Sequence, residues 1–159
     1  MTWDQARVTE VADAYEQHYV LSQGDRAQRL EAEKTAWAWE AVEDGVTQGT
    51  LPVQLLDALL HHPGANEGFR GYVAAGPIED ALSHQPGLYA AAIAERCAAD
   101  AVWADAAAGV WLSDVQWAAL PPQLQRHICA QSTGSFAEAV KAKRRKRPSK
   151  RQSSQPRRG

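Results

Sequence analysis

Alanine is unusually abundant in this chain and supplies 30 of its 159 residues. It is the strongest helix former, because its side chain loses no rotamer freedom in a helix. Alanine on a helix surface also allows a second helix to approach closely. Runs of β-branched residues with a period of two, which would indicate strands, are missing. The composition therefore predicts an all-α fold without a sheet.

Apolar residues recur at helical spacing in short segments that end at glycine or proline. Leu30, Trp37 and Ala41 illustrate this spacing, and we expect them to share the packed face of one helix. Short helices with tight joints predict a compact bundle of about eight helices in antiparallel pairs, similar to helical repeats. No fixed repeat period supports a regular solenoid. The expected helices cover approximately residues 2–21, 25–45, 52–60, 66–75, 77–84, 88–99, 101–111, 121–128 and 135–147.

Polar residues mark several of these helix starts. Thr2 and Gln5 fit a capping box, in which each side chain accepts a hydrogen bond from the other residue's backbone amide. Asp25, Asn66 and Asp100 each precede a helical segment and can act as N-caps. These signals support helix boundaries that spacing alone would leave uncertain by several residues.

The stretch Tyr72–Leu82 reads YVAAGPIEDAL and predicts a break between two helices. Gly76 can end the first helix, and Pro77 needs no amide partner at the start of the second. Glu79 and Asp80 then fall in its first turn, where the helix dipole favours negative charge. The alternative is that these adjacent carboxylates are exposed and serve a partner or a ligand.

The net charge of −2 hides a strong division along the chain. Residues 141–159 contain ten Lys or Arg and no acid, which leaves seven Lys or Arg against nineteen Asp or Glu in residues 1–140, a balance of −12. We therefore divide the chain into an acidic all-α domain (1–134), a basic C-terminal helix (135–147) and a disordered basic tail (148–159). The last segment is polar and has nothing to bury.

The basic segment predicts contact with phosphates, because each Lys or Arg can neutralise a phosphate and release its counterion. No aromatic residue lies among these cations, so base stacking and sequence readout are not expected. Two alternatives stay open: the tail only aids solubility, or it folds back onto the acidic body. The residues predicted to contact nucleic acid are Lys143, Arg144, Arg145, Lys146, Arg147, Lys150 and Arg151.

The sequence argues against several classes of protein. No apolar run is long enough to span a membrane, and the first residues, MTWDQARVTE, do not resemble a signal peptide. Cys97 and Cys129 form no zinc-ribbon or disulfide-scaffold pattern, and a single disulfide between them stays an alternative. We expect a reducing, cytoplasmic location and no bound metal or cofactor. No phosphate-binding loop or nucleophile motif is present, and an enzyme is not expected.

Six tryptophans offer a further candidate surface. Trp37 and Trp39 are two residues apart, so both cannot face the core of one helix; one is exposed or a second layer covers it. We expect core packing for most of the six, and a partner-binding role for Trp39 together with Glu79 and Asp80. Trp117 is expected in a linker.

Several landmarks together resemble an uncharacterised bacterial family of unknown function. They are Trp37-Ala38-Trp39-Glu40 (WxWE), Ala74–Leu82 (with AGPxED), Asp100 and Val110-Trp111, and the similarity covers roughly residues 30–130. The resemblance implies a small helical domain and implies no activity. The basic tail lies outside the matched region, so the resemblance assigns no role to it.

The charge division leads to the main functional prediction, a bacterial, cytoplasmic, non-enzymatic binding protein. Its acidic body would bind a protein partner, and its tail would contact nucleic acid or the ribosome without sequence specificity. One alternative is an immunity- or antitoxin-like inhibitor whose anionic body neutralises a basic toxin. Another is a small metal-dependent hydrolase that uses Glu79, Asp80 and His84, since the last two have the i, i+4 spacing of metal ligands on a helix.

Overall fold

The computed structural model of the protein describes residues 3–128. Within this range the chain is helical and contains no strand, which confirms the predicted all-α fold. The predicted basic helix (135–147) and basic tail (148–159) lie outside the described residues. The seven cations predicted to contact nucleic acid lie outside them as well.

Short helices follow one another with few linking residues. Single residues, Gln85 and Asp100, separate α6 from α7 and α7 from α8. Because such short links force the next helix to fold back, chain neighbours pack side by side, which confirms the predicted compact arrangement of helix pairs. The elements are α1 (Gln5–Ser22), α2 (Arg26–Ala32), the 3₁₀ turn η1 (Glu33–Thr35), α3 (Ala36–Thr47), α4 (Val53–Leu60), α5 (Glu67–Val73), the π-helical turn η2 (Ala74–Ile78), α6 (Glu79–His84), α7 (Pro86–Ala99), α8 (Ala101–Ala108), α9 (Asp114–Ala118) and α10 (Pro122–Gln125).

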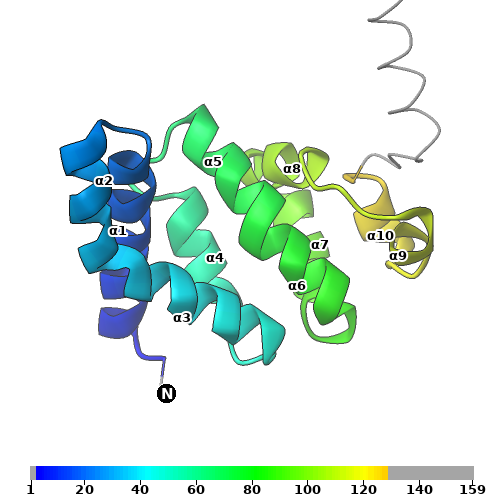
Figure 1. The fold of residues 1–159 in the computed structure, drawn as a ribbon. Helices are drawn as coiled ribbons and strands as arrows, with labels where there is room; N and C mark the ends of the chain where they lie inside the picture. Colours follow the sequence, from blue (N-terminus) through cyan, green and yellow to red (C-terminus); the bar gives the residue numbers. More distant parts are fainter. Residues whose placement is uncertain (1–2, 129–159) are drawn as a thin grey trace, which may run out of the picture.

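The helices form an elongated body (Figure 1). Helices α1 and α2 lie at one end, α9 and α10 lie at the other, and α5, η2 and α6 form a rod that crosses the front. Helix α1 packs against α2, α3 and α4, while α7 packs against α4, α6, α8 and α10. The rod joins these two groups, because α5 contacts α4 and α8, and α6 contacts α3 and α7.

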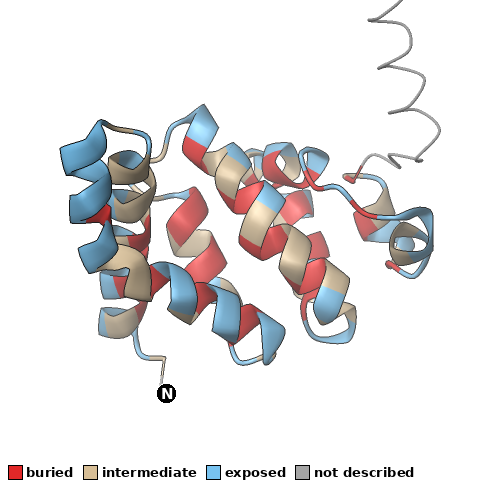
Figure 2. Cartoon of the chain, viewed as in Figure 1, coloured by how far each residue is buried: buried red, intermediate tan, exposed pale blue. Residues whose placement is uncertain are grey.

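The interior is apolar, and no charged side chain in the described part of the chain is buried. Figure 2 shows the buried positions along the inner faces of the helices and the exposed positions outside. Leu55, Leu56, Leu59 and Leu60 bury one side of α4 completely, as its sequence predicts. Each buried leucine side chain contributes about 1.5–3 kcal/mol. Across residues 3–128, no helix has both the length and the apolar character needed to cross a bilayer.

The helix starts use the predicted capping chemistry, with one correction. The N-cap of α1 is Asp4, whose Oδ1 accepts a hydrogen bond from the Arg7 amide at 2.8 Å. The predicted cap, Thr2, lies outside the described residues. Asp25 and Gln28 form a complete capping box at α2. The caps predicted for α5 and α8 are confirmed as well.

The segment predicted as one continuous helix after residue 25 is two helices with a turn between them. Helix α2 ends at Ala32, and the turn Glu33–Thr35 redirects the chain into α3. The Ala32 carbonyl oxygen accepts hydrogen bonds from the Thr35 hydroxyl and from Nδ1 of His18 in α1, both at 2.9 Å, so side chains replace the missing helical bonds. Leu30 is consequently 56% exposed, and its predicted place on a shared packed face is wrong.

The linker predicted around Trp117 is also wrong, because this residue lies in α9. Ser113 and Gln116 form a capping box that starts the helix. The Trp117 indole donates a hydrogen bond to the Ile128 carbonyl oxygen at 3.0 Å, which ties α9 to the chain after α10. A helix this short has too few periodic positions for its pattern to be recognised in the sequence.

One carboxylate connects three helices. Asp57 of α4 accepts hydrogen bonds from Nε of Arg96 in α7 at 2.8 and 2.9 Å, and its Oδ2 lies 2.8 Å from the Nη2 of the same guanidinium. Its Oδ1 also accepts a bond from the indole of Trp103 in α8 at 2.7 Å, and this tryptophan is fully buried. Asp57 therefore holds α7 and α8 against α4.

Removing this carboxylate should destabilise the fold more than breaking an exposed ion pair. We expect Asp57→Ala to lower the free energy of unfolding by about 2–4 kcal/mol, because the Trp103 indole and the Arg96 guanidinium lose their shared acceptor. Glu10→Ala, which breaks the exposed pair with Arg7 (2.8 Å), should cost at most about 1 kcal/mol. Urea unfolding followed by circular dichroism measures both, and equal losses would contradict this role of Asp57.

Candidate functional site

The rod formed by α5 and α6 is kinked at its centre by the residues predicted to break it. Pro77 has no amide proton, and its ring clashes with a carbonyl of the preceding turn in a regular α-helix. The chain accommodates it with the π-helical turn Ala74–Ile78, in which Gly76 has non-helical angles (φ −113°, ψ −105°). The predicted break is therefore a kink within one rod (Figure 1). Wide turns of this kind are frequent at functional sites.

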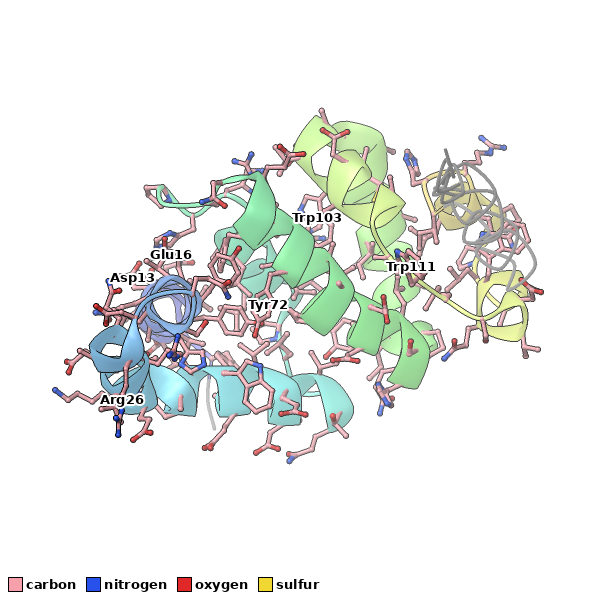
Figure 3. All side chains as sticks on the ribbon, turned by 45° about the horizontal axis from the view of Figure 1, so that its top comes forward. Asp13, Glu16, Arg26, Tyr72, Trp103 and Trp111 are labelled. Carbon is pink, nitrogen blue, oxygen red and sulfur yellow. The ribbon has the colours of Figure 1, made fainter. Side chains whose placement is uncertain are left out.

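The two neighbouring acids that begin α6 reach different parts of the molecule. Glu79 Oε2 accepts a hydrogen bond from the Trp111 amide, in the loop after α8, at 2.8 Å. Asp80 instead lines a pocket together with Tyr72. Figure 3 shows Tyr72 and Trp111 on opposite sides of the rod. Only one of the two predicted carboxylates is therefore at the pocket.

The pocket lies between α1, α3 and the kink of the rod, and has a volume of about 210 Å³. Three aromatic side chains line it: Tyr15 of α1, Trp39 of α3 and Tyr72 of α5. Glu43 of α3 and Asp80 of α6 supply two carboxyl groups from different helices. An apolar side chain of α3, Val42, and residues of the η2 turn complete the lining. The pocket therefore combines aromatic surface with negative charge.

Four aromatic rings fix α1 against α5 and so position two walls of the pocket. Tyr15 and Tyr19 of α1 pack against Phe69 and Tyr72 of α5, with ring centroids 5.1–6.2 Å apart. Each such pair contributes about 0.5–1.5 kcal/mol beyond the area that it buries. Phe69 lies in the core, so the cluster holds the two pocket tyrosines in fixed places.

Tyr15 is only 2% exposed, yet it lines the pocket. A Cβ added at Gly76 would be 3.9 Å from the hydroxyl oxygen. Apart from an interaction with Tyr72, the hydroxyl has no hydrogen-bond partner in the described part of the chain. Burial raises the pKa of Tyr15 far above its usual value, and Tyr72, Asp80 and Glu43 raise it further. The hydroxyl therefore stays protonated in a region of negative potential.

Acidic residues gather on the two helices beside the pocket. Helices α3 and α6 pack against each other and contain no Lys or Arg, and we call them the acidic helix pair. None of their acids forms an ion pair with another described residue. Residues 3–128 as a whole hold seven Lys or Arg against eighteen Asp or Glu, a balance of −11. The acids of the pair are Glu40, Glu43, Asp44, Glu79 and Asp80.

Trp37 and Trp39 have different surroundings, as their spacing predicts. Trp37 packs against the core, and the Arg7 guanidinium lies over its ring with 4.8 Å between Cζ and the ring centroid. Trp39 is 39% exposed and forms one wall of the pocket. An exposed tryptophan beside unpaired carboxylates is a candidate anchor for a partner.

The predicted metal ligands do not converge. Nδ1 of His84 donates a hydrogen bond to the Asp80 carbonyl oxygen at 3.0 Å, so the ring interacts with its own helix. Nε2 of another histidine, His61, lies 2.7 Å from the Asp100 carboxylate and links the end of α4 to the start of α8. Within residues 3–128, no group of three His, Cys, Asp or Glu side chains is placed to hold a metal ion.

Cys97 is a buried free thiol on the inner face of α7, in the position that its spacing predicts. Its Sγ donates a hydrogen bond to the Trp103 carbonyl oxygen at 3.6 Å. Burial raises the pKa of this thiol to about 11, so the thiolate is scarce near neutral pH. The group is therefore unsuited to nucleophilic catalysis.

Of the three residues predicted to bind a partner, Trp39 and Asp80 meet at the pocket and Glu79 does not. Glu43 and the two pocket tyrosines were not predicted. The sequence does contain a signal for Glu43, since it follows Trp39 by four residues and so shares its helix face. The two tyrosines lie on separate helices far apart in the sequence, and only the packing of α1 on α5 brings them together.

Comparisons with protein-family models, with curated proteins and with solved structures found no match for the chain. The resemblance to an uncharacterised bacterial family therefore stays a prediction that rests on its sequence landmarks. The site has to be interpreted from its own geometry.

Glu79 lies in the first turn of α6 as predicted, and its partly buried surroundings disfavour its charged form. Burial raises the pKa of this carboxyl above its ordinary value of 4.5, the hydrogen bond from the Trp111 amide lowers it, and Asp80 raises it again. A carboxyl whose pKa is raised by folding binds its proton more tightly in the native state. Its contribution to stability is therefore greatest at low pH and is lost as the pH rises through the folded-state pKa.

Glu79→Gln should gain stability relative to the natural protein as the pH rises from about 4 to about 7, because the amide oxygen still accepts the Trp111 bond without a charge. Glu79→Ala should be less stable than Glu79→Gln by about 1 kcal/mol, since the Trp111 amide loses that acceptor. Thermal melts at several pH values measure these differences. A Gln variant whose relative stability does not change with pH would show that the Glu79 charge is not desolvated.

Proposed function

We propose that this protein is a non-enzymatic binding protein of the bacterial cytoplasm. Its acidic helical body binds a basic protein partner, and its basic C-terminal segment contacts nucleic acid or the ribosome without reading sequence. The observation that carries the proposal is the division of charge, with −11 in residues 3–128 against ten cations and no acid in residues 141–159.

The acidic helix pair and its exposed tryptophan support a protein partner for the body. Trp39 is the kind of aromatic side chain that anchors protein interfaces. The carboxylates around it on α3 and α6 form no ion pair with other described residues, so they can pair with cations of a partner. Charge complementarity of this kind accelerates association and selects basic partners.

The composition of residues 141–159 supports a separate role in phosphate contact. Lys143–Arg147 supply five consecutive cations, and Lys150 and Arg151 add two more. Such contacts weaken steeply with salt and do not distinguish base sequences. The acidic body would repel the same phosphates, which leaves this segment as the region for nucleic acid.

An immunity- or antitoxin-like inhibitor is an alternative that the same charge supports. In that case the anionic body would cover the nucleic-acid-binding surface of a basic toxin, and the tail would be secondary. A neighbouring gene that encodes a basic protein, together with loss of that protein's toxicity when the pair is co-expressed, would favour this alternative.

The hydrolase alternative has less support, because Glu79, Asp80 and His84 have different surroundings. Glu79 accepts a bond from the Trp111 amide, and the His84 ring bonds to its own helix. Metal analysis of the purified protein tests this alternative directly. One equivalent of metal that disappears in Asp80→Asn would favour the hydrolase over a binding protein.

The role of the body is tested by identifying the proteins that co-purify with the full chain from its native cells, then measuring each purified pair by calorimetry. We expect a basic partner whose affinity falls as salt rises, because exposed charges are screened. The double variant Glu40→Gln/Asp44→Asn, which removes two exposed charges of the acidic helix pair, should bind it more weakly. A partner that binds with the same affinity at low and high salt would contradict the proposal.

Neutralising the basic segment should abolish nucleic-acid binding by the full-length chain. We expect replacement of Lys143–Arg147, Lys150 and Arg151 by Gln to weaken binding to duplex DNA and RNA by at least about 100-fold at low salt. Filter binding measures the loss. The controls Arg26→Gln and Lys34→Gln, which remove exposed cations of the body, should bind like the natural chain, and unchanged binding by the seven-site variant would refute the assignment.

A further inference from the structure

The pocket between α1, α3 and the kinked rod presents aromatic rings and carboxylates to the same space. Aromatic rings attract cations over their faces, and tryptophan does so most strongly. Trp39, Tyr15 and Tyr72 supply three such rings, and Glu43 and Asp80 add negative charge from two helices. Both kinds of group favour a positively charged ligand and disfavour an anion.

The polar groups of this pocket have few partners within the protein. The carboxylates of Glu43 and Asp80 form no ion pair or hydrogen bond with another described residue. The Tyr15 side chain is almost completely buried, and Tyr72 is the one hydrogen-bond partner of its hydroxyl among the described residues. Polar groups in such a place normally bond to water or to a ligand. The pocket therefore has unused hydrogen-bonding capacity.

The kink borders the space beside these groups, because residues of the η2 turn line the pocket. A Cβ at Gly76 would lie 3.9 Å from the Tyr15 hydroxyl, so a larger side chain at this position would extend toward the polar groups of the pocket. The glycine of the η2 turn leaves that space open.

A guanidinium group fits this set of residues better than an ammonium group. It is planar, so it stacks on an indole or phenol ring, and it donates hydrogen bonds from two edges in a fixed geometry. Carboxylates on two different helices, Glu43 and Asp80, can each accept bonds from one edge. Guanidinium is also more weakly hydrated than ammonium, which lowers the cost of entering an aromatic pocket.

We propose that the pocket lined by Tyr15, Trp39, Glu43, Tyr72 and Asp80 binds the guanidinium group of an arginine side chain on a partner protein. This inference rests on the proposed function, because that function supplies the basic partner. The exposed indole stacks on the guanidinium, the two carboxylates accept its N–H bonds, and the buried tyrosine hydroxyl offers a further acceptor.

Titration of the full-length, ¹⁵N-labelled protein with N-acetyl-arginine amide tests the chemistry of the pocket. We expect a saturable shift of the Trp39 indole resonance, assigned with the variant Trp39→Phe. N-acetyl-citrulline amide, which has a similar shape without the charge, should produce no saturable shift. N-acetyl-lysine amide should bind at least about tenfold more weakly. Absence of a saturable shift with the arginine compound, or equal affinity for the lysine or citrulline compound, would overturn the inference.

Variants of the carboxylates locate the binding site. Glu43→Gln and Asp80→Asn should each weaken binding of N-acetyl-arginine amide by about tenfold or more, because each removes a charge-assisted hydrogen bond. Glu95→Gln removes the same charge from α7, an exposed position outside the pocket and the acidic helix pair, and should leave the affinity unchanged. Glu43 is exposed, so its variant keeps the test valid even if Asp80→Asn does not fold. Equal affinities in Glu43→Gln and Glu95→Gln would place the arginine elsewhere.

The same variants separate this inference from the proposed function. If a basic partner protein binds the natural chain, Glu43→Gln and Asp80→Asn equally well, the inference fails and the proposed function stands. If N-acetyl-arginine amide binds as expected but no basic protein partner is found, the proposed function fails, and the partner named in this inference fails with it.

Discussion

A proline in the middle of a helix determines how the two halves of this molecule meet. Pro77 cannot continue a regular helix, and the π-helical turn Ala74–Ile78 lets the chain pass it without separating α5 from α6. The resulting rod contacts both groups of helices, α1 to α4 on one side and α7 and α8 on the other. After the turn, Asp80 lies at the pocket and Glu79 accepts a hydrogen bond from the Trp111 amide. A sequence element that could have been a simple break therefore organises both the packing and the candidate site.

The carboxylates of this protein fall into two groups with different physical roles. Asp57 stabilises the fold, since its carboxylate accepts hydrogen bonds from the Arg96 guanidinium and the Trp103 indole and so joins three helices. Asp80 and Glu43 have no such partners in the described residues, and their charges add to the field of an already acidic body. Unpaired carboxylates oppose compactness through mutual repulsion. Their presence beside an exposed aromatic side chain is more easily explained by binding than by stability.

The sequence predicted the helices well and the junctions between them less well. Alanine content and apolar spacing were sufficient for the all-α fold, and Asp25 marked a helix start correctly because an N-cap acts on amides only two or three residues away. The turn Glu33–Thr35 was missed because a bond from His18, in another helix, helps to hold it. Trp39 and Asp80 were named as binding residues, but their meeting in one pocket depends on how α1, α3 and the rod pack, and local patterns carry no information about that packing.

The order of the helices along the chain has a consequence for biosynthesis. Helix α1 makes its main contacts with α2, α3 and α4, so this N-terminal group can bury apolar surface before the later helices have left the ribosome. Contacts between chain neighbours close only short loops, and helical proteins built this way fold in about microseconds to milliseconds. The rod emerges afterwards and supplies Tyr72 and Asp80. A nascent chain would therefore have a compact anionic N-terminal part well before the pocket lined by Tyr15, Trp39 and Tyr72 is complete.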